Sequence, residues 1–199
     1  LRLKSGLAPV NRFLAAGIPV ALGIDEAGIN DDRDMLQEMR MALRLHREPG
    51  IDAPHPSPAQ VLRMATEHGA ATTPFGAAIG RLSPGCFADA VLFDWPRVTR
   101  PWQSPDVPLV DVLVQRARTD AVKTVLVGGE VVLEDGRFTR LDRDAVLDEI
   151  AARMAQPLTP AELARRDLAR DVFPHVRRFY DGWLEGLGDE PHYRGSGRS

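Results

Sequence analysis

A continuous apolar run from Ile18 to Ile24 constrains the possible folds of this chain more than any other feature. Its apolar residues do not alternate with polar ones, which is typical of a strand buried on both faces of a parallel sheet. One such strand cannot form a sheet alone, so the run predicts an α/β protein with further strands beside it. Asp25 follows directly, at the strand end where α/β barrels place their catalytic groups. An aspartate there could equally cap a helix or form a turn, so its position leaves both interpretations open.

Helices are predicted on both sides of this run. Residues 9–16 are expected to form a short helix, and apolar residues recur at helical spacing over 35–46 with Asp34 as the N-cap. A further helix begins at Ser57, with Pro58 at its first position. The order of helix, buried strand, helix and helix is that of an α/β protein.

The composition changes near Thr72, where a small and mainly antiparallel β unit is predicted. Its short strands are expected over residues 79–82, 88–95, 122–127 and 130–134. Gly128 and Gly129 join the last two strands, and a two-residue Gly-Gly loop between β-branched runs is a strong hairpin signal. Residues 109–118 between these strands are expected to form a short helix.

The last part of the chain is predicted to be helical again from Asp142. Thr159 begins a capping box with Glu162. Arginines and aspartates interleave over the following residues, which favours a solvated helical face over a basic patch.

Charge and composition exclude several classes of function. The chain has 199 residues with 25 Lys and Arg against 28 Asp and Glu, so its net charge of −3 gives no electrostatic case for nucleic acid. No apolar run approaches the roughly 20 residues that span a bilayer. One cysteine, Cys86, rules out an internal disulfide and fits a reduced, cytoplasmic setting. The chain opens with Leu1, from which we expect it to be a fragment of a longer sequence.

The histidines form no recognisable metal-binding set. They are His46, His55, His68, His175 and His192. None is paired as His-x-His or spaced as His-Glu-x-x-His, so structural or solvent-facing roles are expected. His46 is expected at the edge of a core and His68 near a helix end. The nucleophile elbow, the phosphate loop and the dinucleotide glycine fingerprint are also missing from the sequence.

Three segments carry motifs in a fixed order. The first segment runs from Leu14 to Asp25 and is followed by Leu36-Gln37-Glu38-Met39-Arg40. The second runs from Val61 to Ala70 and continues into Ile79-Gly80-Arg81-Leu82-Ser83-Pro84-Gly85 and Ala88 to Asp94. The third runs from Val122 to Gly136. Together they resemble the carboxyl-terminal half of the metal-dependent amidohydrolase superfamily. The chlorohydrolase and aminohydrolase branch, which includes cytosine- and guanine-deaminase-like enzymes, is the most similar. Ile24 and Cys86 depart from the residues usual in that branch, threonine and lysine.

The resemblance implies a fold and a domain organisation. Residues 1–73 would be the last strand and helices of a (β/α)8 TIM barrel, 74–140 part of a small composite β-sandwich, and 141–199 a C-terminal helical extension. The fold class is therefore α/β, with the chain forming the C-terminal portion of such a barrel.

The resemblance also implies an activity. Asp25 would be a metal ligand and a catalytic general base in the hydrolysis of a carbon–nitrogen or carbon–halogen bond of a small heterocyclic substrate, hydrolytic deamination being favoured over dechlorination. The metal would be divalent, zinc or else iron. Asn30 and Asp31 could contact the substrate, although turn-forming roles explain them equally well. In its complete form such an enzyme is expected to be a homo-oligomer, a dimer.

The sequence departs from the family in one large respect. The family's His-x-His and its later histidines and glutamate have no counterpart here, and one aspartate cannot hold a metal. The remaining ligands are therefore expected outside this chain. A second hypothesis is a catalytically incomplete remnant or subunit that serves as a structural or interaction module. A third is another amidohydrolase branch that opens imidazolone or dihydropyrimidine rings.

Overall fold

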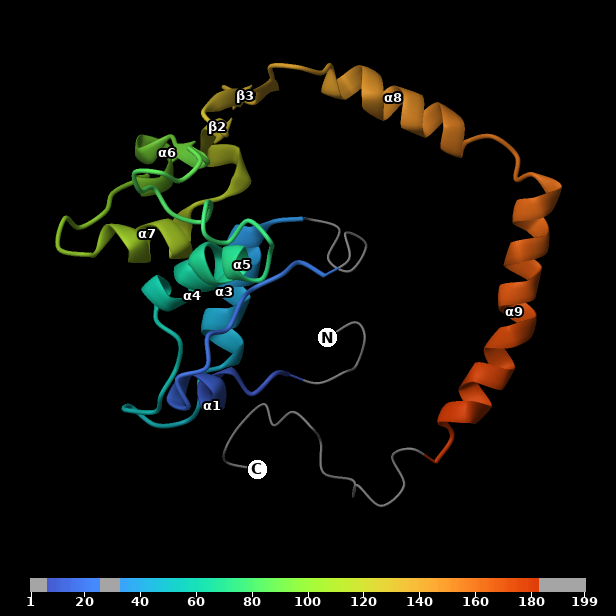
Figure 1. Cartoon of the computed structure of the whole chain (residues 1–199), viewed down its shortest axis with the longest axis horizontal. Coiled ribbons are helices and arrows are strands. Elements are labelled where there is room, and N and C mark those ends of the chain that lie inside the picture. Colours follow the sequence, from blue (N-terminus) through green and yellow to red (C-terminus); the bar gives the residue numbers. More distant parts are fainter. Residues whose placement is uncertain (1–6, 26–32, 183–199) are drawn as a thin grey trace. The chain divides into compact units, whose positions relative to one another are not determined.

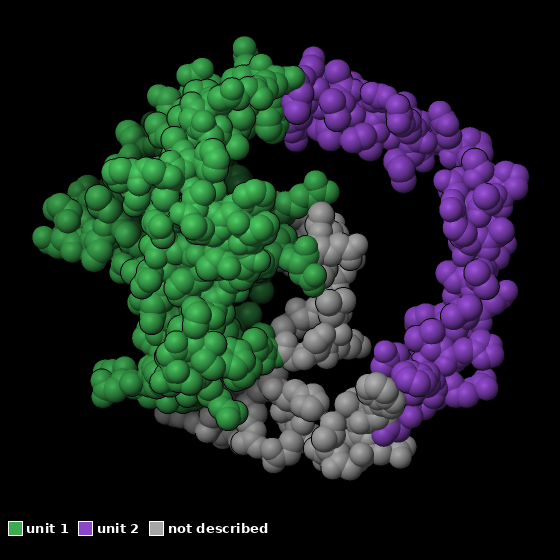
Figure 2. Space-filling model, in the orientation of Figure 1, with its two compact units in different colours: residues 1–140, 195–199 green, residues 141–194 purple. Residues whose placement is uncertain are grey.

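The computed structural model describes residues 7–25 and 33–182, which divide into two compact units (Figures 1 and 2). The first unit is described up to Arg140 and the second from Leu141 onward. The first contains helices and a small sheet, and two helices are described in the second.

Helices of the first unit enclose its main hydrophobic core. They are α1 (Val10–Ala15), α3 (Met35–Leu45), α4 (Pro58–Ala65), α5 (Glu67–Ala71) and α7 (Leu109–Arg116). The buried side chains come from four of these helices: Val10, Met39, Ala42, Leu43, Val61, Met64 and Val114. The predicted helix starts are confirmed, since the Asp34 carboxylate accepts from the Leu36 N–H and Ser57 forms a capping box with Gln60.

The first unit also contains a four-stranded antiparallel sheet. Its strands lie in sequence order: β1 (Ala90–Phe93), β2 (Val122–Val127), β3 (Glu130–Glu134) and β4 (Arg137–Phe138). Gly128 and Gly129, both with positive φ, join β2 to β3 as predicted. Between β1 and β2 lie α6 (Trp95–Thr99), α7 and the short helix η1 (Thr119–Ala121). Val98, Val112, Ala117 and Ala121 form a second small core there.

The prediction of a strand over residues 79–82 is wrong, because these residues form a bend without regular secondary structure. Gly80 has φ +86, and a Cβ at this position would lie 2.6 Å from the Cβ of Ala70 in α5. The backbone therefore approaches α5 closely in a left-handed conformation, which a strand residue does not adopt. The β-type pattern of the sequence marks a tight contact with a helix here.

The apolar run from Ile18 to Ile24 has no regular secondary structure. Val20 and Leu22 pack against the main core, but Ile18 is 50% exposed, so the expected burial on both faces is not observed. A strand exists through hydrogen bonds to a neighbouring strand. Among the described residues, the neighbours of this run are helices α4 and α5 and not another strand, which explains why no strand forms.

The second unit, over its described residues 141–182, contains α8 (Arg143–Met154) and α9 (Pro160–Tyr180). Asp142 caps α8, and Thr159 forms the predicted capping box with Glu162. Neither helix contains a buried residue. Within the described part of the chain, no helix has both the length and the apolar character needed to cross a membrane.

Candidate functional site

Asp25 lies at the exposed end of the apolar run, with a φ of +63. Aspartate and asparagine tolerate this left-handed backbone better than most residues do. Asn30 and Asp31, the predicted substrate-binding residues, lie outside the described residues, so their role stays a prediction.

Hydrogen bonds at Val20 and Leu22 attach the apolar run to α4 and α5. The Leu22 N–H donates to the Met64 carbonyl at 3.0 Å, and Nδ1 of His68 lies 2.9 Å from the Val20 carbonyl. Met64 is fully buried in the core. The run is therefore attached to α4 and α5 along one edge.

A buried arginine connects the start of α3 to the end of α7. Nη1 of Arg40 donates to the Ala117 carbonyl at 2.8 Å, and Nη2 forms an ion pair with Asp34 at 3.5 Å. Arg40 is 4% exposed, so its charge is compensated by neighbours rather than by water. Asp34 is thereby fixed nine residues after Asp25. The sequence alone indicates no role for Arg40 beyond its place in the Glu-Met-Arg motif.

The described histidines lie in separate places. His46 is half-buried beside α1, and burial lowers the pKa of its imidazole below 6.5. His55 lies in a loop, where Nδ1 is 3.2 Å from the Ala53 carbonyl, and His175 is exposed on α9. The expectation of a core-edge position for His46 is confirmed. His68 lies in the short helix α5, near a helix end as expected, and its Nδ1 is close to the Val20 carbonyl in the apolar run.

The described residues do not form a metal site by themselves. A zinc site in a protein needs at least three side-chain ligands. Over residues 7–25 and 33–182, no group of three or more His, Cys, Asp or Glu side chains is placed to hold a metal ion. Asp25 supplies one carboxylate, which does not fit a complete zinc site.

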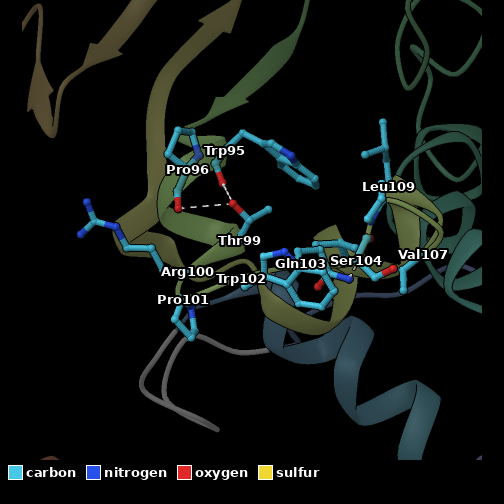
Figure 3. Close-up of a pocket in the computed structure, with 12 residues that line it drawn as sticks. Trp95, Pro96, Thr99, Arg100, Pro101, Trp102, Gln103, Ser104, Val107 and Leu109 are labelled. Carbon is cyan, nitrogen blue, oxygen red and sulfur yellow. Dashed lines mark hydrogen bonds between the residues drawn. The ribbon is translucent and has the colours of Figure 1, made fainter.

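A pocket of about 650 Å³ lies on the surface beside α6 and α7 (Figure 3). Tryptophans 95 and 102 and three prolines line much of it, and Asp25 is not among its lining residues. Polar groups near it are engaged: the Thr99 hydroxyl donates to the Trp95 carbonyl at 3.0 Å, and Arg116 donates to the Trp102 carbonyl and to Oε1 of Gln103. The pocket therefore presents rings and no general base. Its Trp-Pro and Pro-Trp pairs are the sequence signals that could have located it.

Comparisons with known proteins give a consistent family. The model of the amidohydrolase family matches residues 1–132. A 5-methylthioadenosine/S-adenosylhomocysteine deaminase of Syntrophomonas wolfei is 38% identical over 148 residues, covering 74% of this chain and 33% of the deaminase. A protein of the same name from Desulfovibrio desulfuricans is 40% identical over 153 residues, covering 76% and 34%.

Solved structures agree with the sequence comparisons. A zinc-bound adenosine deaminase of Xanthomonas campestris matches with a TM-score of 0.68 and 29% identity, covering 75% of this chain and 34% of the deaminase. An atrazine chlorohydrolase of Arthrobacter aurescens in complex with zinc matches with a TM-score of 0.64 and 28% identity, covering 74% and 32%. The chain thus spans about a third of the length of the proteins it matches.

Proposed function

The chain belongs to the amidohydrolase family, and from this we propose that it contributes the last part of the barrel and part of the β-sandwich to a metal-dependent hydrolase. The observation that carries the proposal is Asp25, exposed at the end of an apolar run inside the matched region. The activity belongs to a protein that contains this chain together with the remaining two thirds of the family length.

Asp25 is proposed as the catalytic carboxylate. Asp25 is exposed, and its carboxylate is proposed to act as a metal ligand and as a general base that takes a proton from the attacking water and delivers it to the leaving amine. Attachment of the preceding run to α4 and α5 supports this role, because a base must be held in place to act. Asn30 and Asp31 are proposed to contact the substrate.

The proposed reaction is hydrolytic deamination of a heterocycle. Two relatives at 38% and 40% identity are named as 5-methylthioadenosine/S-adenosylhomocysteine deaminases, which favours a carbon–nitrogen bond over a carbon–halogen bond. The metal is proposed to be zinc, which the two matching structures contain, with iron as the alternative. Its other ligands are proposed to come from residues outside this chain.

The Asp25→Asn substitution in the complete protein tests the proposal. Asparagine keeps the preference for positive φ and removes the base, so we expect ammonia release to fall by about 10²-fold or more. Asp135→Asn is a matched control, since Asp135 is also exposed with positive φ, at 46°, and lies in the turn before β4.

Three results would contradict the proposal. Unchanged turnover of Asp25→Asn with the metal retained would remove Asp25 from the site. No metal and no hydrolysis in the complete wild-type protein would favour the structural or interaction module instead. Ring opening without ammonia release from a small heterocycle panel would assign a different amidohydrolase branch.

A further inference from the structure

We propose that His68 is a positioning residue for Asp25: its imidazole holds the Val20 carbonyl and so fixes the backbone that presents the catalytic carboxylate. The proposal rests on the function proposed above. His68 lies on α5, far from Asp25 in sequence, and its Nδ1 is 2.9 Å from the Val20 carbonyl. A carbonyl oxygen only accepts, so Nδ1 carries the hydrogen and donates it.

The hydrogen bonds at Val20 and Leu22 lie on the same edge of the apolar run. Val20 and Leu22 are two residues apart, so in an extended chain their backbone groups point to the same side. Their partners, Met64 and His68, lie on either side of Thr66, where α4 ends and α5 begins. The Met64 carbonyl accepts from Leu22 while the His68 ring donates to Val20. Together they hold the run as a neighbouring strand would.

Helix α5 is itself held in place, which makes His68 a firm anchor. A Cβ at Gly80 would lie 2.6 Å from the Ala70 Cβ and 3.0 Å from the Thr66 carbonyl oxygen. A Cβ at Gly76 would lie 2.8 Å from the Ala70 carbonyl oxygen. The turn around these glycines therefore packs directly on the backbone of α5. The helix cannot shift away from the apolar run without breaking this packing.

The contact through Nδ1 allows a positioning role of His68 to be distinguished from a role as a general base. Nδ1–H is a donor in both the neutral and the protonated imidazole, so the contact does not require one protonation state. Loss of His68 should therefore lower kcat with little change in KM and without changing the shape of the pH profile. A general base at this position would change that shape.

Substitutions that separate the two ring nitrogens test the proposal. The amide of asparagine reaches the place of Nδ1, and the longer amide of glutamine reaches toward the place of Nε2. We expect His68→Ala and His68→Gln to speed hydrogen exchange of the Leu22 amide in this chain by about 5- to 10-fold. This factor corresponds to the loss of one hydrogen bond, the one between His68 and the Val20 carbonyl beside Leu22. His68→Asn should restore it. His55→Ala is the control, since His55 contacts only a nearby loop carbonyl among the described residues.

The kcat of the same variants is measured in the complete protein. A fall in kcat for His68→Ala and His68→Gln, with recovery in His68→Asn, supports the proposal. Unchanged exchange at Leu22, equal rescue by glutamine, or equally faster exchange at the buried Val61 amide of α4 would each overturn it. If wild-type protein lacks hydrolase activity while the exchange pattern holds, the proposed function fails and the anchoring by His68 stands.

Discussion

The two units of this chain are stabilised in opposite ways. The first unit surrounds cores in which Val61, Met64 and Val114 are completely buried. In the second unit, described over residues 141–182, no helix residue is buried, and apolar side chains such as Ile150 and Phe173 remain 51% and 64% exposed. Helices in the first unit are therefore held mainly by packing, and helices in the second by signals within the helix itself.

Those local signals are visible in α8 and α9. Asp142 accepts from two N–H groups at the start of α8, and Thr159 and Glu162 form a reciprocal capping box at the start of α9. Arg153 and Glu149 form an i,i+4 pair on α8. Caps and pairs of this kind are worth a fraction of what core burial supplies. The comparison predicts that equivalent substitutions will have unequal effects in the two units.

The largest difference is expected between two apolar truncations. Met64→Ala removes a fully buried side chain and should lower the free energy of unfolding by about 2–5 kcal/mol. Ile150→Ala removes a half-exposed one and should change it by less than about 0.5 kcal/mol. Urea denaturation of both variants measures this. Similar losses would show that Ile150 is covered in solution and would break the comparison.

Next in size is a pair of arginine substitutions. Arg40→Ala removes the buried donor to the Ala117 carbonyl and the cation that pairs with Asp34, so a loss of about 3 kcal/mol is expected. Arg153→Ala removes an exposed partner of Glu149, which is worth about 0.5 kcal/mol or less. Thermal unfolding at two salt concentrations separates them, because salt screens the exposed pair. A strong salt dependence of the Arg40 effect would contradict its burial.

Removal of the helix caps should give smaller effects. Ser57→Ala and Thr159→Ala each cost about 1 kcal/mol. For Ser57 the loss should appear in the unfolding of the whole first unit, because α4 supplies Val61 and Met64 to its core. For Thr159 it should appear as lost helical circular dichroism of α9 alone. A lower urea midpoint of the first unit in Thr159→Ala would show that the units are coupled.

The smallest expected effects are those of pH, which acts on the two units in different ranges. Burial lowers the pKa of His46 below 6.5, so the unfolded chain binds a proton first and the first unit loses stability as pH falls below 6.5. Hydrogen bonds from the Thr159 hydroxyl and backbone lower the pKa of Glu162 below 4.5. This support for α9 is present above 4.5 and is lost as pH falls through the lowered value. Circular dichroism and urea midpoints followed across both ranges measure the two losses.

Substitution of each group identifies its contribution. His46→Gln should remove the step below pH 6.5 and leave the one below 4.5. Thr159→Ala should weaken the lower step and leave the upper one. A change in the upper step caused by Thr159→Ala would contradict the assignment.

The sequence predicted the local structure well and the surroundings of the apolar run poorly. Asp34, Ser57 and Thr159 begin helices as expected, because an N-cap acts within its own turn. The Gly128-Gly129 hairpin is local in the same sense. The family also followed from motifs in a fixed order, which the comparisons confirm.

The two strand predictions that failed concern segments whose structure is set by the segments packed against them. The run before Asp25 is apolar enough for a buried strand, but a strand is defined by the strand beside it, and the described residues contain none for it. Residues 79–82 have the composition of a strand, but the close approach of Gly80 to α5 decides their structure. The contact of His68 with Val20 joins residues 48 positions apart, and no pattern in the sequence indicates it.

Two methionines give the division between the units a chemical consequence. Met64 has no exposed surface, whereas Met154, at the end of α8, is 80% exposed. Peroxide attacks a thioether that it can reach, and the sulfoxide it forms is polar and reversible by reductases. Oxidative damage should therefore accumulate first on α8, where the added polarity displaces no packed neighbour. The core around Met64 would be protected for as long as it stays closed.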